Sequence, residues 1–169
     1  MGKMLEIIIH WLKDTPKEYI VMIVGAIPIF ELRLAIPLGF YQFHMTLVNA
    51  FWLSVLGNIM PILPVLFLLE PISNRLGKFR VWSRFFDWFS ERTKKKADVI
   101  QKYEALGLAL FVAVPLPGTG AWAGCLAASL FKIRFRYAFI AIVAGVIGAG
   151  IIVSVLCALG MITWKAVVS

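Results

Sequence analysis

Residues 106–131 read LGLALFVAVPLPGTGAWAGCLAASLF, an apolar segment that is broken in its middle by proline and glycine. The parts on either side of the break, 106–116 and 121–131, are 11 residues long each, so that each would span about 16 Å as a helix. That length is about half of a ~30 Å hydrocarbon core. The pattern predicts two half-helices that form a re-entrant hairpin over residues 105–132. A single kinked span through the whole membrane is the alternative.

Residues 17–45 show a similar pattern around a charged break. The apolar runs 19–30 and 34–43 are separated by the sequence Glu31-Leu-Arg33. In a single kinked span both charges would lie near the bilayer centre, at a cost of about 2.5–3.5 kcal/mol each. In a re-entrant hairpin, the irregular backbone and the charges at that depth line a cavity within the protein. We therefore expect a first re-entrant hairpin here.

Two further apolar runs are long and uninterrupted by charge. Residues 47–69 and 138–159 are 23 and 22 residues long. At about 1.5 Å per residue, each crosses a ~30 Å core with some tilt. They predict transmembrane helices over 46–71 and 134–162. Small residues in the second helix allow close approach of another helix.

The composition agrees with a membrane protein. The apolar residues make up 61% and the charged residues 15% of 169 residues, more apolar surface than so small a soluble chain can bury. The net charge is +8, and most of the excess lies between residues 75 and 102. Basic charge that is bracketed by apolar spans indicates anionic lipid at the cytoplasmic face and argues against nucleic-acid binding. Cys125 and Cys157 lie in apolar runs, where we expect buried free thiols.

The segments between the spans have a surface character. Phe79, Trp82, Phe86 and Phe89 are spaced by three and four residues among basic ones, which predicts a basic amphipathic cytoplasmic helix over 72–104. Residues 1–16 predict a short interfacial helix.

The two halves of the chain resemble each other. AIPI at 26–29 matches AVPL at 113–116, an offset of 87, and AFWLSVLG at 50–57 matches AFIAIVAG at 138–145, an offset of 88. Each half therefore consists of a broken hairpin and one full span, which places the second copy upside down relative to the first. The predicted fold is an all-α integral membrane protein, a single domain of residues 1–169 with two inverted repeats.

Glu31 and Arg33 are the strongest candidates for chemistry. A carboxylate inside a membrane can take up and release a proton, because burial disfavours its charged form. An arginine there can hold a phosphate or carboxylate through paired hydrogen bonds. A static ion pair is the alternative interpretation.

The break in the second hairpin is the other candidate. Free N–H groups at the start of the helix that follows it would favour an anion, although a plain helix cap explains the same residues. Two further polar side chains are candidates for lining a cavity. The predicted break residues are Pro115, Pro117, Gly118, Thr119 and Gly120, and the predicted cavity-lining residues are Asn58 and Trp122. His10 and His44 are isolated, and we expect no metal, no cofactor and no enzyme activity.

Three stretches resemble a known family. They are PIFELRLAIPLG at 28–39, GNIMP at 57–61 and FVAVPLPGTGAWAG at 111–124. They resemble the bacterial and archaeal small multi-drug export proteins, which are in turn similar to the DedA (SNARE-associated or VTT) superfamily. This resemblance implies paired re-entrant helices that face one another, and proton-coupled transport or movement of polyprenyl-phosphate lipid carriers. It covers nearly the whole chain, with departures at Leu34, where glycine is expected, and at Ala123, where threonine is common.

By resemblance, the family's motif positions are Glu31, Arg33, Pro115, Pro117, Gly118, Thr119 and Gly120. We expect a multi-pass transporter in the cytoplasmic membrane of a bacterium or archaeon, which contacts anionic lipids. Its expected substrate is a small amphipathic solute or an anionic lipid headgroup. The alternative function is a non-transporting protein that organises lipid or assembles partners. The short chain leaves a homodimer open, with the glycine-lined last span as one contact surface.

Overall fold

A computed structural model describes residues 15–68, 97–116 and 119–160. The described elements are all helices, as the sequence predicts, and the described part of the chain contains no strand. The predicted interfacial helix, most of the predicted amphipathic helix, and Pro117 and Gly118 lie outside the described residues. The elements are α2 (Lys17–Ala26), α3 (Glu31–Pro37), the π-helical turn η1 (Leu38–Gln42), α4 (Leu47–Ile59), α7 (Ala97–Ala113), α8 (Ala121–Leu130) and α9 (Phe135–Ala158).

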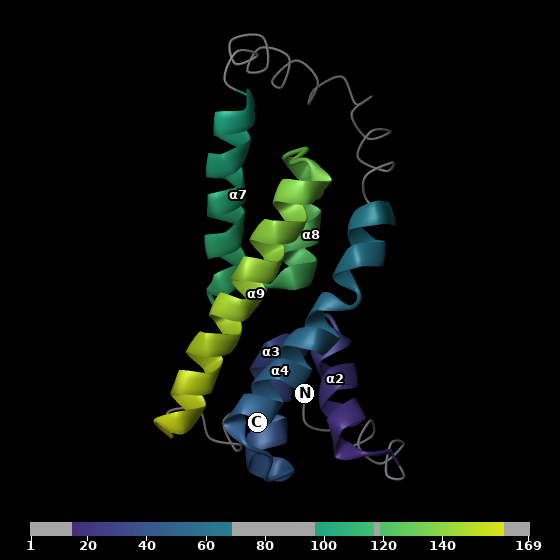
Figure 1. Ribbon diagram of the computed structural model, residues 1–169, viewed down its shortest axis with the longest axis vertical. Coiled ribbons are helices and arrows are strands. Elements are labelled where there is room, and N and C mark those ends of the chain that lie inside the picture. Colours follow the sequence, from purple (N-terminus) through teal and green to yellow (C-terminus); the bar gives the residue numbers. More distant parts are fainter. Residues whose placement is uncertain (1–14, 69–96, 117–118, 161–169) are drawn as a thin grey trace.

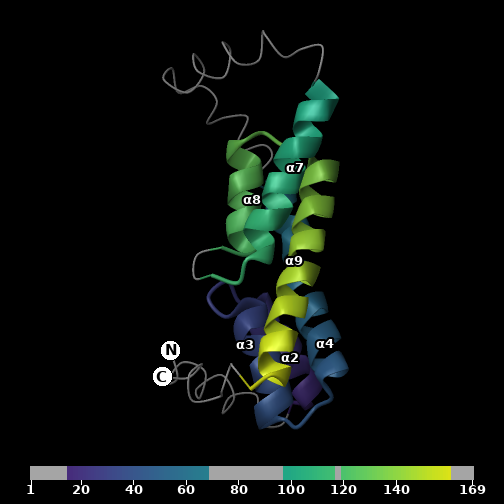
Figure 2. The ribbon, with the colours of Figure 1, turned by 90° about the vertical axis from the view of Figure 1, so that its left-hand side faces the viewer.

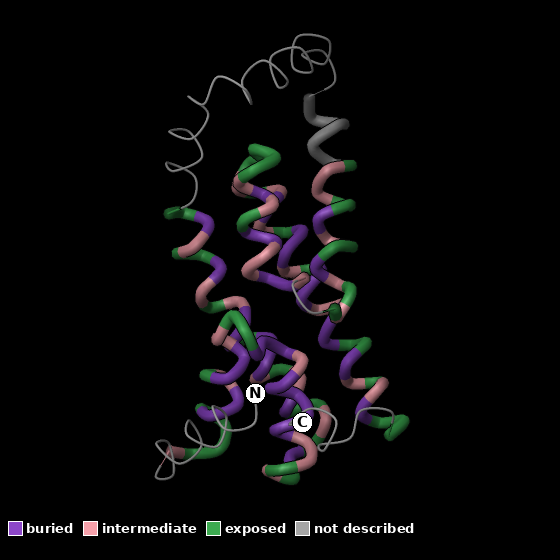
Figure 3. Tube along the Cα trace, turned by 180° about the vertical axis from the view of Figure 1, so that it is seen from behind, coloured by how far each residue is buried: buried purple, intermediate pink, exposed green. Residues whose placement is uncertain are grey.

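Within the described residues, two helices are long and apolar enough to cross a membrane. One is α4 with its continuation beyond a turn at Met60 and Pro61, giving Leu47–Leu68 with 22 residues; the other is α9 with 24 residues. In the most apolar 18-residue stretch of each helix the mean hydropathy is 2.0 and 2.7, and only 33% and 39% of that stretch is buried within the chain. Buried and exposed residues alternate along both helices (Figure 3), so each span packs one face inward and leaves an apolar face outward. Lipid chains can cover an exposed apolar face of this kind.

The remaining helices form two pairs at opposite ends of the molecule. Helices α2 and α3 are joined by a turn at residues 27–30, and α7 and α8 are joined at residues 114–120. The two turns face each other near the middle of the long axis (Figures 1 and 2). Helix α4 packs on α2 and α3, and α9 packs on α7 and α8 as well as on α3 and α4. Helix α7 begins at Ala97, before residue 105, where the sequence placed the start of the second hairpin.

Glycines set the closest helix contacts. A Cβ at Gly57 of α4 would collide with the backbone carbonyl group of Met22 on α2, whose carbon would be 2.8 Å away. A Cβ at Gly145 of α9 would lie 2.7 Å from the carbonyl oxygen of Ala109 on α7. The contact of α4 with α2 and the contact of α9 with α7 therefore each depend on a glycine that admits the neighbouring backbone.

The other glycines of α9 also contact this chain. A Cβ at Gly148 would lie 3.2 Å from the Ala113 side chain, and one at Gly150 would lie 2.7 Å from the Phe51 ring. The glycines that the sequence offered as a dimer contact are thus covered by α7 and α4. Both cysteines are buried free thiols, as expected.

Candidate functional site

Glu31 begins α3 in a backbone conformation that is rare for a residue with a side chain. Its φ is 49°, in the left-handed region, which costs about 1–3 kcal/mol outside glycine. The turn before it is closed by the N–H groups of Phe30 and Glu31, which both donate to the Ile27 carbonyl at 3.1 and 3.0 Å. The side chain is only 7% exposed. A buried carboxylate on a strained turn marks this position as a functional candidate.

The Glu31 carboxylate lies against the start of α8. A Cβ at Gly120 would collide with this carboxylate, lying 2.7 Å from both Cδ and Oε1. The backbone N–H of Trp122, the second residue of α8, hydrogen-bonds to the same carboxylate. Gly120 itself supplies no side-chain cap. Glu31 therefore caps α8 from the opposite hairpin, and the anion that the sequence predicted at this helix start is the chain's own carboxylate.

Arg33 makes the second link between the two turns. One of its Nη atoms donates both to the Thr119 carbonyl and to the Thr119 hydroxyl, the latter at 3.1 Å. The hydroxyl in turn donates within its own turn, lying 2.6 Å from the Val114 carbonyl oxygen and 2.9 Å from that of Leu116. The guanidinium is half-buried. Arg33 is thus bound to the opposite hairpin through a threonine that closes that hairpin's turn.

Trp122 makes a third link. Its indole Nε1 donates to the Ala26 carbonyl, the last residue of α2, at 3.3 Å. Each of the three links joins the end of one helix pair to the end of the other. The facing turns are therefore held together by polar contacts that involve Glu31, Arg33 and Trp122.

A small cavity lies between these turns and the two spans. Besides Glu31 and Arg33, its lining is Leu32, Asn58, Val112, Gly120, Ala121, Val146 and Ala149. It has room for about one water molecule. Asn58 is the twelfth of the 22 residues of Leu47–Leu68, and Val146 is the twelfth of the 24 residues of α9. The site therefore lies midway along both candidate spans.

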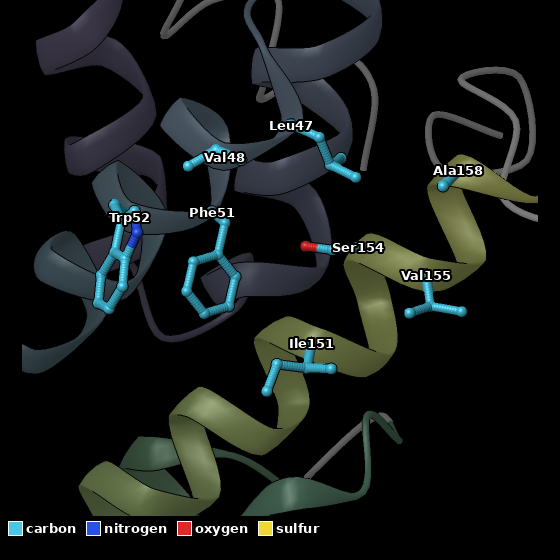
Figure 4. Close-up of a pocket in the computed structure, with 8 residues that line it drawn as sticks. All are labelled: Leu47, Val48, Phe51, Trp52, Ile151, Ser154, Val155 and Ala158. Atoms are coloured by element: carbon cyan, nitrogen blue, oxygen red, sulfur yellow. The ribbon is translucent and has the colours of Figure 1, made fainter.

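A larger groove is open to the outside between α4 and α9 (Figure 4). Its volume is about 310 Å³, and its lining is Leu47, Val48, Phe51, Trp52, Ile151, Ser154, Val155 and Ala158. Apart from the Ser154 hydroxyl, the groove presents apolar side chains. It suits an apolar body rather than a charged group.

The structure brings most of the predicted site residues together. Glu31, Arg33, Thr119, Gly120 and Trp122 form the links between the turns, and Asn58 lines the adjoining cavity. Pro115 lies half-buried in the turn after α7.

Sequence reasoning missed Ser54, which is fully buried one helical turn before Asn58. Its spacing of four residues from Asn58 was the available signal. Among the described residues, no three His, Cys, Asp or Glu side chains gather as a metal site.

Comparison with known proteins supplies the family. A family model described as "Putative small multi-drug export protein" matches residues 31–152. The match covers 122 of 169 residues and begins at Glu31 itself. No curated protein and no solved structure matches the chain. Because the model covers more than two-thirds of the sequence, this chain belongs to the small multi-drug export protein family.

Proposed function

We propose that this protein is a proton-coupled membrane transporter of the DedA-like type, in which the two facing turns form a gate at mid-membrane. The single observation that carries the proposal is the contact of the Glu31 carboxylate with the start of α8, midway along both spans. A buried carboxylate and an arginine at that depth are costly, and in membrane proteins such groups mark transport pathways.

Two inverted repeats with re-entrant hairpins fit the geometry. The glycines Gly57 and Gly145 are 88 residues apart, and each admits the backbone of a preceding helix, at Met22 and Ala109, which are 87 residues apart. These offsets equal the two offsets found between the matching sequence stretches.

The ends of the two hairpins match as well. His44 and Lys132, 88 residues apart, both have a φ of 52° just before a long span. Equal offsets in contacts and in backbone conformation support a repeat, and the facing turns support hairpins that enter from opposite sides.

Protonation of Glu31 provides a physical means of opening the gate. The carboxylate gains from the dipole and the N–H groups at the start of α8 only while it is charged. A proton removes much of that attraction, so that Glu31 can leave its left-handed conformation. Separation of the turns then exposes Arg33, which an anionic group can bind in place of the Thr119 oxygens.

The site favours an anionic substrate over a cationic one. Arg33 keeps a fixed positive charge, whereas the one carboxylate is already paired with a helix start. The groove between α4 and α9 offers room for an apolar body. The proposed substrate is therefore an amphipathic anion, either a small solute or a polyprenyl-phosphate type of lipid headgroup. We place the transporter in the cytoplasmic membrane, in contact with anionic lipids, and the proposal includes no enzymatic step.

The proposal is tested with purified protein in liposomes under an imposed pH gradient. Three probes are compared: a fluorescent amphipathic sulfonate, a lipophilic cationic dye and a fluorescent short-chain polyprenyl phosphate. We expect pH-driven movement of one anionic probe, and Glu31→Gln and Arg33→Gln each reduce it at least tenfold. The matched controls are Glu18→Gln and Arg136→Gln, which change exposed side chains and leave the flux intact.

The same assay separates the alternatives. Movement of the sulfonate identifies a small solute, and movement of the polyprenyl phosphate identifies a lipid carrier. If no probe moves and Glu31→Gln lowers only the stability of the protein, the links between the turns are structural. The non-transporting, lipid-organising function is then favoured.

A further inference from the structure

Two buried polar side chains on α4 each carry an oxygen atom without a hydrogen-bond partner among the described residues. Asn58 is 1% exposed and Ser54 is 0% exposed. Neither the Asn58 Oδ1 atom nor the Ser54 Oγ atom has a hydrogen-bond partner within the described part of the chain. Buried polar atoms are nearly always satisfied by protein or by ordered water. These two residues therefore require an explanation that packing alone does not provide.

Asn58 lies beside a cavity in which a partner fits. It lines the cavity that Glu31, Arg33 and Gly120 also line, and this cavity accommodates about one water molecule. A buried water needs two to four polar partners. The same lining contains the side-chain amide of Asn58, whose Oδ1 atom lacks a partner, together with Glu31 and Arg33. The other lining side chains are small or apolar and compete for none of these bonds.

Other occupants fit less well. A metal cation would lie beside the fixed charge of Arg33 and would find too few oxygen ligands among the lining residues, since Na⁺ and Ca²⁺ sites gather several. A substrate molecule is too large for a space of this size. Water satisfies the orphaned acceptor without adding charge.

We propose that this cavity holds an ordered water between Asn58 and Glu31, and that Asn58 positions this water as the donor and acceptor of the Glu31 proton. A hydronium ion there gives one proton to a Glu31 carboxylate oxygen, leaving a neutral carboxylic acid and a water molecule. The reverse step returns the proton to water. Ser54, four residues earlier on the same face of α4, is the next buried polar side chain toward the end of the helix that begins at Leu47.

The surroundings leave water as the nearest proton source. Among the described residues, the charged or titratable groups that face Glu31 are Arg33 on its own helix and Cys125 on α8. From α4 the cavity receives Asn58, from α7 Val112, and from α9 Val146 and Ala149, none of which titrates. Arginine stays charged and a buried thiol is a poor donor, so a proton reaches Glu31 through water. This role rests on the proposed function of Glu31.

The water itself is tested without any transport assay. In water-edited solid-state NMR of the protein in liposomes, magnetisation passes from water to the Asn58 side-chain amide and to the Glu31 Cδ. We expect both signals in the unchanged protein. Asn58→Leu, which replaces the amide by an apolar group of similar size, removes the transfer to Glu31. Asn58→Ser keeps a side-chain oxygen, and we expect this variant to retain the transfer from water to Glu31. Ala149→Val narrows the same cavity from α9 and serves as a second variant if Asn58→Leu fails to fold.

The proton step is tested by infrared difference spectroscopy after a pH jump, with the carboxylic acid band of Glu31 assigned by its loss in Glu31→Gln. We expect Asn58→Leu to slow the appearance of this band at least tenfold and to leave its final amplitude unchanged. Absence of water transfer in the unchanged protein overturns the proposal whether or not Glu31 titrates. If the unchanged protein shows magnetisation transfer from water, but the Glu31 band appears at the same rate in Asn58→Leu, the role of Asn58 is overturned.

A third outcome concerns the proposed function. If water is present but no band belongs to Glu31, the proton site of the proposed function fails, and the proton role of this water is overturned with it. In that outcome the water signal still distinguishes a hydrated structural cavity from a dry one.

Discussion

Gly120→Ala is expected to separate the two facing turns, because the methyl group would occupy the place of the Glu31 carboxylate. The new Cβ would meet the Oε2 atom of Glu31 first and would also lie 2.7 Å from Oε1, whereas an ordinary contact begins near 3.4 Å, so the carboxylate must retreat by more than 0.7 Å (3.4 Å less 2.7 Å). That movement breaks a hydrogen bond between a charged acceptor and the Trp122 N–H, which contributes about 1.5–3 kcal/mol.

The backbone of Gly120 adds a second cost. Its φ of 142° and ψ of −170° lie in a region that is essentially reserved for glycine, and alanine there costs about 1–3 kcal/mol. Together the two effects lower the free energy of unfolding by roughly 2.5–6 kcal/mol. Gly107→Ala is the matched control, since a Cβ at Gly107 meets nothing within 4 Å inside a helix. That substitution is neutral or stabilises by about 0.5–1 kcal/mol.

The assay is reversible unfolding in mixed micelles, carried out as a double-mutant cycle with Glu31→Ala. Without the carboxylate, Gly120→Ala retains only its backbone cost. We therefore expect a coupling energy of about 1.5–3 kcal/mol between the two positions. Equal costs of Gly120→Ala in both backgrounds would show that the Glu31 carboxylate does not lie at the start of α8, and would refute the reasoning.

Three further predictions use the same unfolding assay. Gly57→Ala and Gly145→Ala each force a methyl group against a neighbouring backbone carbonyl group, so each costs about 1–3 kcal/mol or more; a loss below 1 kcal/mol in either would contradict the described helix crossings. Thr119→Val keeps the carbonyl acceptor of Arg33 and loses the hydroxyl acceptor, so we expect a loss of about 1 kcal/mol and a larger loss in Arg33→Lys, because lysine cannot reproduce the guanidinium geometry. A tolerated lysine would argue against the link. Tyr41→Phe removes the hydrogen bond from the phenol to the Cys157 carbonyl at 2.8 Å and costs about 1 kcal/mol, whereas the exposed Tyr103→Phe serves as its control and is expected to cost nothing measurable.

The sequence predicts the helices of this fold better than the contacts of its site. Short apolar runs separated by charge or by a proline- and glycine-rich break identify the helix pairs, and long runs without charge identify the candidate spans, because the bilayer fixes the required lengths. Glu31 and Arg33 stand out since charges are rare in such runs.

The partners of these residues were beyond sequence reasoning. Glu31 and Gly120 are 89 residues apart, and only the packing of two helix pairs onto α4 and α9 brings them together. For that reason the sequence predicts an anion at the start of α8 without identifying it, and the structure shows that this anion is the carboxylate of Glu31 in the opposite turn. Ser54 was overlooked because a serine in an apolar run is unremarkable until its burial is known.

The central claim, that two hairpins enter the membrane from opposite sides, is tested most directly by the sidedness of two turns. His44 and Lys132 are exposed and each lies between a hairpin and a long span. Single cysteines are introduced by His44→Cys and Lys132→Cys in a background with Cys125→Ala and Cys157→Ala, and intact cells are labelled with an impermeant thiol reagent. Re-entrant hairpins place the two positions on opposite sides, so one labels in intact cells and the other only after permeabilisation. Labelling of both positions from the same side would mean four plain spans and would contradict the account.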